Sequence, residues 1–149
     1  MPIRVEIVSQ DRMVYEGDVD SVVVPGVAGE MGILPHHAPL LSTLKYGIIK
    51  VHTREGEELF TVAGGVIEVQ PEIVTILADA AENVEEIDVT RAEAAKRRAE
   101  EMLQHGPPPD TDAYLAMEAA LRRSNLRLEA ARRYRSGRAS RNPGAGENR

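Results

Sequence analysis

Residues 59–77 decide the fold: they read Leu-Phe-Thr-Val-Ala-Gly-Gly-Val-Ile-Glu-Val-Gln-Pro-Glu-Ile-Val-Thr-Ile-Leu. Three short apolar runs, most of them rich in β-branched residues, are separated here by Gly64-Gly65 and by Gln70-Pro71-Glu72. Runs of this length, bounded by Gly and Pro, are typical of β-strands. Gly64-Gly65 predicts a tight bend or bulge, because it lacks both the spacing and the following helix of a phosphate-binding loop.

The same pattern extends toward the N-terminus. Residues 3–7 alternate between aliphatic and charged side chains, which is the period of a strand with one buried face. The valines at 22–24 end at a Pro-Gly turn, and residues 48–53 and 59–63 flank a five-residue, Gly-containing loop that predicts a hairpin. Many short strands at close spacing indicate a β-sandwich or a barrel.

After Glu85 the pattern becomes helical. Asp88 is the expected N-cap of a first helix, and Gly106 to Pro109 cannot continue it because proline lacks the backbone N–H. Asp110, Thr111 or Asp112 is expected to cap a second helix. Helices of ~17 and ~24 residues joined by so tight a break are expected to pack antiparallel as a hairpin. The stretch 136–149, rich in Gly, Ser, Arg and Asn, predicts a disordered tail.

The composition excludes several classes of protein. The 149 residues include no Cys, which rules out a disulfide scaffold, Cys-ligated zinc and a thiol nucleophile. No apolar run reaches the ~20 residues of a membrane helix, and the first residues carry no apolar signal segment, so we expect a soluble intracellular protein. The few serines and histidines fall in unrelated segments, so we expect no catalytic residues and no metal centre.

The charge divides at the same place as the pattern. Residues 1–86 carry five basic and fifteen acidic side chains, whereas residues 87–149 carry thirteen basic and nine acidic ones. The stretch 122–141 alone has eight arginines and a single acid, Glu129. It is open to three interpretations: a solvated helix face, a cationic arm that meets an acidic partner or a phosphate, or a nucleic-acid-binding helix. The last predicts exposed aromatic residues between the cations, and only Tyr114 and Tyr134 lie there.

The spacing of four arginines is more specific. Arg91 and Arg98 share one face of the first helix, and Arg123 and Arg127 share one face of the second. If these faces meet, four guanidinium groups converge, which is unfavourable unless an anion fills the cluster. Asp88 would lie beside it and could accept a hydrogen bond from a ribose or a base. A polyphosphate nucleotide is the obvious anion, although long arginine side chains can instead splay into water.

Two long motifs resemble a known family. Residues 29–41, GEMGILPHHAPLL, are similar to the signature loop of the epsilon subunit of F-type ATP synthases, and so are residues 62–70 followed by residues 74–79. The resemblance in order and spacing covers residues 2 to 134. It implies a ten-stranded β-sandwich over residues 1–84, a regulatory helical hairpin over 85–135, and a tail over 136–149.

The resemblance also implies a function and a set of partners. The chain is expected to be a non-catalytic rotor subunit, without a metal, that couples the catalytic head to the proton-driven c-ring. Its sandwich is expected to bind the gamma shaft and the c-ring, with Glu30 and His37 in the stretch that faces them. The adjacent His36 and His37 point apart on an extended chain and make a poor metal chelate, so a docking loop is the better interpretation. The expected location is the cytoplasmic face of a bacterial plasma membrane, or the stromal side of a thylakoid, with membrane contact only through partners and no nucleic acid bound.

The same resemblance assigns a ligand and an inhibitory role to the hairpin. Residues 87–92 match a family motif, I-D-x-x-R-A, that binds ATP as a regulatory ligand. The residues implied to hold it are Glu82, Ile87, Asp88, Arg91, Ala92, Arg98, Arg123 and Arg127. In an extended state, Arg122, Arg132 and Arg133 are expected to meet acidic segments of the alpha and beta subunits and to block ATP hydrolysis.

Overall fold

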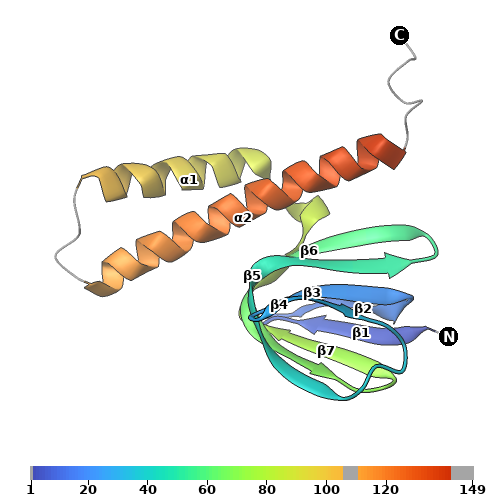
Figure 1. The fold of residues 1–149 in the computed structure, drawn as a ribbon. Helices are drawn as coiled ribbons and strands as arrows, with labels where there is room; N and C mark the ends of the chain where they lie inside the picture. The colour runs from blue at the N-terminus through green and yellow to red at the C-terminus, as the bar shows by residue number, and fades with distance from the viewer. Residues whose placement is uncertain (1, 106–110, 142–149) are drawn as a thin grey trace, which may run out of the picture. The chain divides into compact units, whose positions relative to one another are not determined.

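The computed structural model describes residues 2–105 and 111–141, with side chains placed as far as Tyr134. The chain divides after Val84 into two compact units, one built of strands and one of helices (Figure 1). The change of character near Glu85 in the sequence therefore coincides with the division in the structure.

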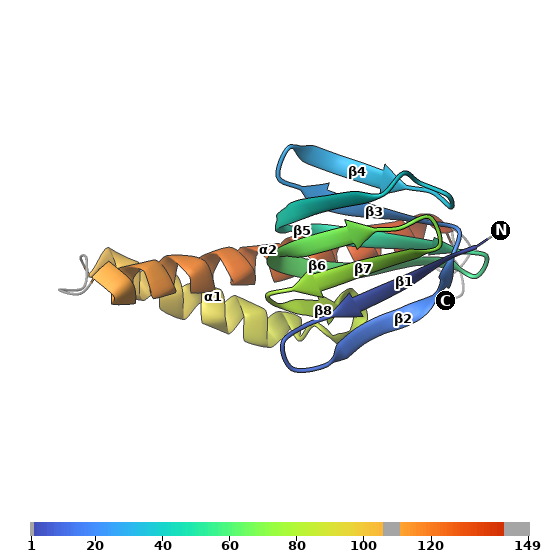
Figure 2. The ribbon, with the colours of Figure 1, turned by 90° about the horizontal axis from the view of Figure 1, so that it is seen from below.

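The first unit is an antiparallel sheet with one parallel pair. Its strands are β1 (Ile3–Val8), β2 (Met13–Val19), β3 (Ser21–Gly26), β4 (Gly29–Ile33), β5 (Leu40–Thr53), β6 (Gly56–Val69), β7 (Ile73–Ala78) and β8 (Ala81–Asn83). They pair in the order β2-β1-β7-β6-β5-β3-β4, with β8 attached to β6 (Figure 2). Among the described strands only β1 and β7 run parallel, and the long connection between them contains β2 to β6.

The period-2 pattern of the sequence fills the core. Ile3, Val5 and Ile7 have no exposed surface, while the residues between them are half-buried. Phe60 is the largest of the fully buried side chains, and Tyr15 packs against it with ring centroids 5.2 Å apart. Burying such side chains contributes roughly 1.5–3 kcal/mol each, which is the main term that stabilises the unit.

The predicted number of strands is wrong. We expected ten, and the residues that the structure describes form eight. The runs 59–63 and 66–69, expected as separate strands, belong to one 14-residue strand, β6. Its first half pairs with β8 and its second half with β7, so the strand passes from one pairing environment to another.

Gly64-Gly65 makes this continuity possible, and the bend predicted there is confirmed. Gly64 and Gly65 have φ values of 84° and 138°, a region that side-chain-bearing residues rarely enter. A Cβ on Gly65 would lie 2.3 Å from the carbonyl oxygen of Leu77, so the backbones of β6 and β7 approach closely only because no side chain is present.

The second unit is an antiparallel helical hairpin, as predicted. A 3-10 turn, η1 (Val84–Glu86), leads to α1 (Val89–Gln104) and α2 (Thr111–Arg141), which lie side by side (Figure 1). The helix α2 is 31 residues long and continues six residues past the predicted end at 135. Gly137 alone costs only about 1 kcal/mol in a helix, and no proline occurs between Thr111 and Pro143, so nothing local ends the helix at 136. The interhelix turn 106–110 and the predicted tail beyond 141 lie outside the described residues.

Small side chains form the contact between the two helices. Ala92 and Ala99 of α1 are buried, as are Ser124 and Ala131 of α2. The hydroxyl of Ser124 donates a 3.1 Å hydrogen bond to the carbonyl oxygen of Ala120, which satisfies it within its own helix. Side chains of this size let the helix backbones approach closely, and the larger side chains of Met117, Leu121 and Leu128 are half-buried. Neither helix, over the described residues, combines the length and hydrophobicity needed to cross a bilayer.

Candidate functional site

The start of α1 is fixed by its cap, as predicted. Asp88 has extended backbone angles, and its Oδ1 accepts a 3.0 Å hydrogen bond from the backbone N–H of Arg91. The carbonyl oxygen of Asp88 accepts the first helical hydrogen bond, from Ala92. A cap of this kind stabilises a helix by about 1 kcal/mol. It also holds the exposed carboxylate of Asp88 at the first turn, one turn away from the Arg91 side chain.

The hairpin has a groove along one flank. It encloses about 500 Å³, and it is lined by Val89, Glu93, Lys96, Asn125, Leu128, Glu129, Ala131 and Arg132. Of these residues only Arg132 was a predicted site residue. The groove is formed by residues of two helices that are more than 25 positions apart in the sequence, so no local sequence motif indicates it. We call it the hairpin groove.

Helical geometry places four predicted arginines on the opposite flank. Successive residues turn by about 100° around a helix, so Arg91 and Arg98 lie on the other side of the Ala92–Ala99 contact line from the groove residues of α1. On α2, Arg123 and Arg127 likewise lie across the Ser124–Ala131 line from Asn125 and Arg132. Because the groove residues of both helices share one flank, these four arginines share the other. We call it the arginine flank.

Three of the four cations of the arginine flank have no ion-pair partner among the described residues. Arg91, Arg98 and Arg123 are exposed, and none has an ion pair with another residue in the part of the chain that the structure describes. Arg127 is half-buried and already has an interaction. Elsewhere in the hairpin, by contrast, Arg133 lies 2.9 Å from Glu129 and Lys96 lies 4.0 Å from Glu100. Unpaired guanidinium groups on one flank form a surface that attracts multivalent anions.

The other residues predicted to bind the nucleotide or to inhibit hydrolysis do not lie together. Ile87 is half-buried just before α1, and Ala92 is buried against α2. Arg122 is exposed, Arg132 lines the hairpin groove, and Arg133 is held by Glu129. Glu82 lies on β8, in the strand unit.

One contact in the hairpin was not predicted. The hydroxyl of Tyr134, near the end of α2, donates a hydrogen bond to Oε1 of Glu85, just before α1. The two residues are 49 positions apart, so no sequence pattern indicates the pair. The bond joins the helices at the end of the hairpin opposite to the turn, where no covalent connection holds them.

Replacing Tyr134 by phenylalanine is expected to loosen this end of the hairpin. A side-chain hydrogen bond contributes about 1 kcal/mol, so the ratio of open to closed hairpins should rise about fivefold. Hydrogen exchange of the α2 amides measures the ratio. Tyr114→Phe is the matched control, because Tyr114 interacts within its own helix: a hydrogen bond to Glu118, together with the charge of that carboxylate, raises the pKa of Tyr114. Equal exchange in the two variants would contradict the role of the contact.

The predicted docking loop presents apolar side chains at the surface. Leu34 and Leu41 are 62% and 72% exposed. Between them His36 has a φ of 64° and donates its backbone N–H to Pro71, and His37 Nδ1 lies 2.7 Å from the carbonyl oxygen of Ala38. Glu30 is exposed on β4, with Oε1 3.8 Å from Nζ of Lys50. The loop is therefore held in shape by its backbone while its leucines face outward. No group of His, Cys, Asp or Glu among the described residues has metal-binding geometry.

Both units match known family models. The description of the first is "ATP synthase, Delta/Epsilon chain, beta-sandwich domain", over residues 2–84, and that of the second is "ATP synthase, Delta/Epsilon chain, long alpha-helix domain", over residues 85–132. The chain belongs to the epsilon-subunit family of the F-type ATP synthases. Members of this family are non-catalytic subunits of a complex that synthesises ATP with the transport of ions.

Curated relatives and solved structures agree with this assignment. The chain is 44% identical over 133 residues to the ATP synthase epsilon chain of Dehalococcoides mccartyi, covering 89% of this chain and 94% of that one. It is 46% identical over 131 residues to the epsilon chain of Halalkalibacterium halodurans, covering 88% and 98%. A chain in the cryo-EM structure of the Euglena gracilis mitochondrial ATP synthase (OSCP/F1/c-ring, rotational state 1) has a TM-score of 0.71 and 28% identity, over 87% of this chain and 81% of that one. A chain in the central stalk/c-ring structure of the Tetrahymena thermophila enzyme shares the fold, with a TM-score of 0.58 and 13% identity.

Proposed function

We propose that the chain is a central-stalk subunit that connects the catalytic head of the ATP synthase to the c-ring and regulates ATP hydrolysis. Its similarity to a chain solved within an F1/c-ring assembly supports this role. The sandwich would hold the gamma shaft and the c-ring, with Glu30, His37 and the exposed leucines of the docking loop at the contact. The chain would then be a peripheral membrane protein, held at the cytoplasmic or stromal side through its partners.

The hairpin would act as a movable arm. At 1.5 Å per residue, α1 and α2 are about 24 and 46 Å long, so an opened hairpin would reach about 70 Å. In that state Arg122, Arg132 and Arg133 would meet acidic segments of the alpha and beta subunits and oppose hydrolysis.

ATP would favour the closed arm. Only there do Arg91 and Arg98 share a flank with Arg123 and Arg127, so a polyphosphate binds the closed state better than the open one. A ligand present at its Kd contributes only about 0.4 kcal/mol, whereas a shift from 1:99 to 99:1 needs about 5.5 kcal/mol. ATP would therefore regulate the arm only if the open and closed states are nearly balanced in free energy.

The helical hairpin carries the regulatory part of this proposal, and a comparison of two chains tests it. The full chain, added to a catalytic head with its gamma subunit, should bind and inhibit ATP hydrolysis. A chain of residues 1–84 should bind as well but inhibit much less, since it lacks the arm. Equal inhibition by both chains would contradict the arm, and failure of both to bind would contradict the stalk function.

A further inference from the structure

Tyr134 lies in the same row of α2 as two arginines of the arginine flank. A helix makes one turn in 3.6 residues, so Tyr134 follows Arg127 after about two full turns and follows Arg123 after about three. The three side chains therefore lie one above another along α2. Tyr134 is half-buried, and it ends the part of this row whose side chains the structure describes.

Glu85 takes the corresponding place beside α1. It lies in η1, just before the N-cap Asp88, and the first turn of α1 then leads to Arg91. Its Oε1 accepts the hydrogen bond that the hydroxyl of Tyr134 donates. The bond thus connects the arginine row of α2 to the segment that leads into the arginine row of α1. It does so at the end of the hairpin opposite to the covalent turn.

This bond depends on the closed hairpin, whereas other polar contacts of the hairpin do not. The pairs Lys96–Glu100 and Arg133–Glu129 join residues four positions apart within one helix. Contacts within one helix survive when the two helices separate. The bond between Tyr134 and Glu85 joins residues from the two ends of the hairpin and is lost on opening. It therefore contributes directly to the balance between the closed and the open arm.

We propose that Tyr134 is a positioning residue for the nucleotide site. Its hydroxyl, through Glu85, holds the two arginine rows on one flank and so raises the affinity for ATP without touching the nucleotide. This inference rests on the proposed binding of ATP to the arginine flank. Because ATP needs the closed arm and inhibition needs the open one, the same bond should strengthen ATP binding and weaken inhibition.

The expected effect of removing the hydroxyl is moderate. Loss of one side-chain hydrogen bond of ordinary strength changes the ratio of open to closed hairpins about fivefold. The apparent Kd for ATP varies inversely with the closed fraction. If the two states are equally populated, Tyr134→Phe lowers the closed fraction from about one half to about one sixth. The Kd for ATP should then rise about threefold.

Isothermal titration calorimetry of ATP on the full chain measures this change, and Glu85 provides the specific test. Glu85→Gln and Glu85→Leu remove the same negative charge, but only the glutamine keeps an oxygen that accepts the hydroxyl hydrogen. Glu85→Gln should therefore bind ATP about threefold more tightly than Glu85→Leu. In combination with Tyr134→Phe this difference should disappear, because the donor is then absent from both chains.

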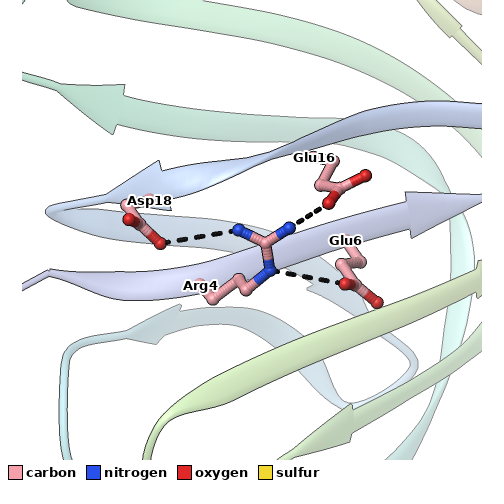
Figure 3. A network of polar contacts seen from close by, with 4 residues as sticks. All are labelled: Arg4, Glu6, Glu16 and Asp18. Carbon is pink, nitrogen blue, oxygen red and sulfur yellow. Dashed lines mark hydrogen bonds and ion pairs between the residues drawn. The ribbon is translucent and has the colours of Figure 1, made fainter.

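Arg4 of the strand unit supplies the matched control (Figure 3). Its Nε lies 3.4 Å from Oε1 of Glu6, its Nη1 lies 3.8 Å from Oδ1 of Asp18, and its Nη2 contacts Glu16. Arg4→Gln therefore breaks polar contacts between side chains, as Tyr134→Phe does, but between β1 and β2 instead of within the hairpin. Its affinity for ATP should equal that of the wild type.

Inhibition provides a second readout with the opposite sign. Added to a catalytic head with its gamma subunit, Tyr134→Phe should inhibit ATP hydrolysis more strongly than the wild type. Weaker ATP binding together with weaker inhibition would show a damaged hairpin and would overturn the assignment. If Tyr134→Phe binds ATP as Arg4→Gln does, the positioning role is wrong and the nucleotide site stands. If the wild type does not bind ATP, the nucleotide site fails and the positioning role fails with it.

Discussion

Gly65→Ala is expected to lower the free energy of unfolding of the strand unit by about 3 kcal/mol. Its Cβ would lie 2.3 Å from the carbonyl oxygen of Leu77 and 2.9 Å from the Cα of Ala78, both of them backbone atoms that cannot turn aside. The φ of 138° adds strain for any residue with a side chain. Either β7 must separate from β6 or the bend must straighten, and each change disrupts the pairing that buries Ile67 and Ile76.

Urea denaturation of the full chain, followed by far-UV circular dichroism, measures this loss. Gly32→Ala is the matched control, because a Cβ on Gly32 would have no atom within 4 Å and its φ lies outside the positive range. We expect this control to change stability by less than about 1 kcal/mol. Equal urea midpoints for Gly65→Ala and Gly32→Ala would contradict the prediction that the close approach of the backbones at Gly65 is needed for stability.

Arg91→Ala is expected to weaken ATP binding about tenfold or more. Hydrogen bonds to charged groups contribute about 1.5–3 kcal/mol, and Arg91 has no competing ion pair among the described residues that its loss would release. Arg97→Ala is the matched control. It removes the same charge from the same helix, but helical geometry places Arg97 off the arginine flank. Isothermal titration calorimetry on the full chain measures both affinities. If the two variants lose affinity equally, the flank acts only through its overall charge and the site assigned to it is wrong.

Much of the fold could be predicted from local patterns, because local chemistry determines it. The alternation in residues 3–7 predicts β1, and Asp88 predicts the start of α1. The strand count could not be predicted in this way. Whether Gly64-Gly65 ends a strand or only bends it depends on how β7 and β8 pair on either half of β6, and these are tertiary contacts.

The end of α2 shows a different limit. Gly137 and Ser140 weaken a helix but do not stop it, so composition alone placed the boundary too early. Within the hairpin, helical spacing was sufficient to place Arg91 with Arg98 and Arg123 with Arg127. The sequence does not show that all four arginines lie on one flank, which follows only from the position of the hairpin groove. The contact between Tyr134 and Glu85 could likewise be found only in the structure.

Hydrogen exchange of the full chain, with and without ATP, tests most directly whether the closed hairpin is a nucleotide-dependent state. If the arginine flank binds ATP, saturating nucleotide should slow exchange in both α1 and α2, and the protection should be lost in Arg91→Ala but kept in Arg97→Ala. Exchange in β1 to β7 should not change, because no residue proposed to bind ATP lies in those strands. Identical exchange of the two helices with and without ATP would contradict the account.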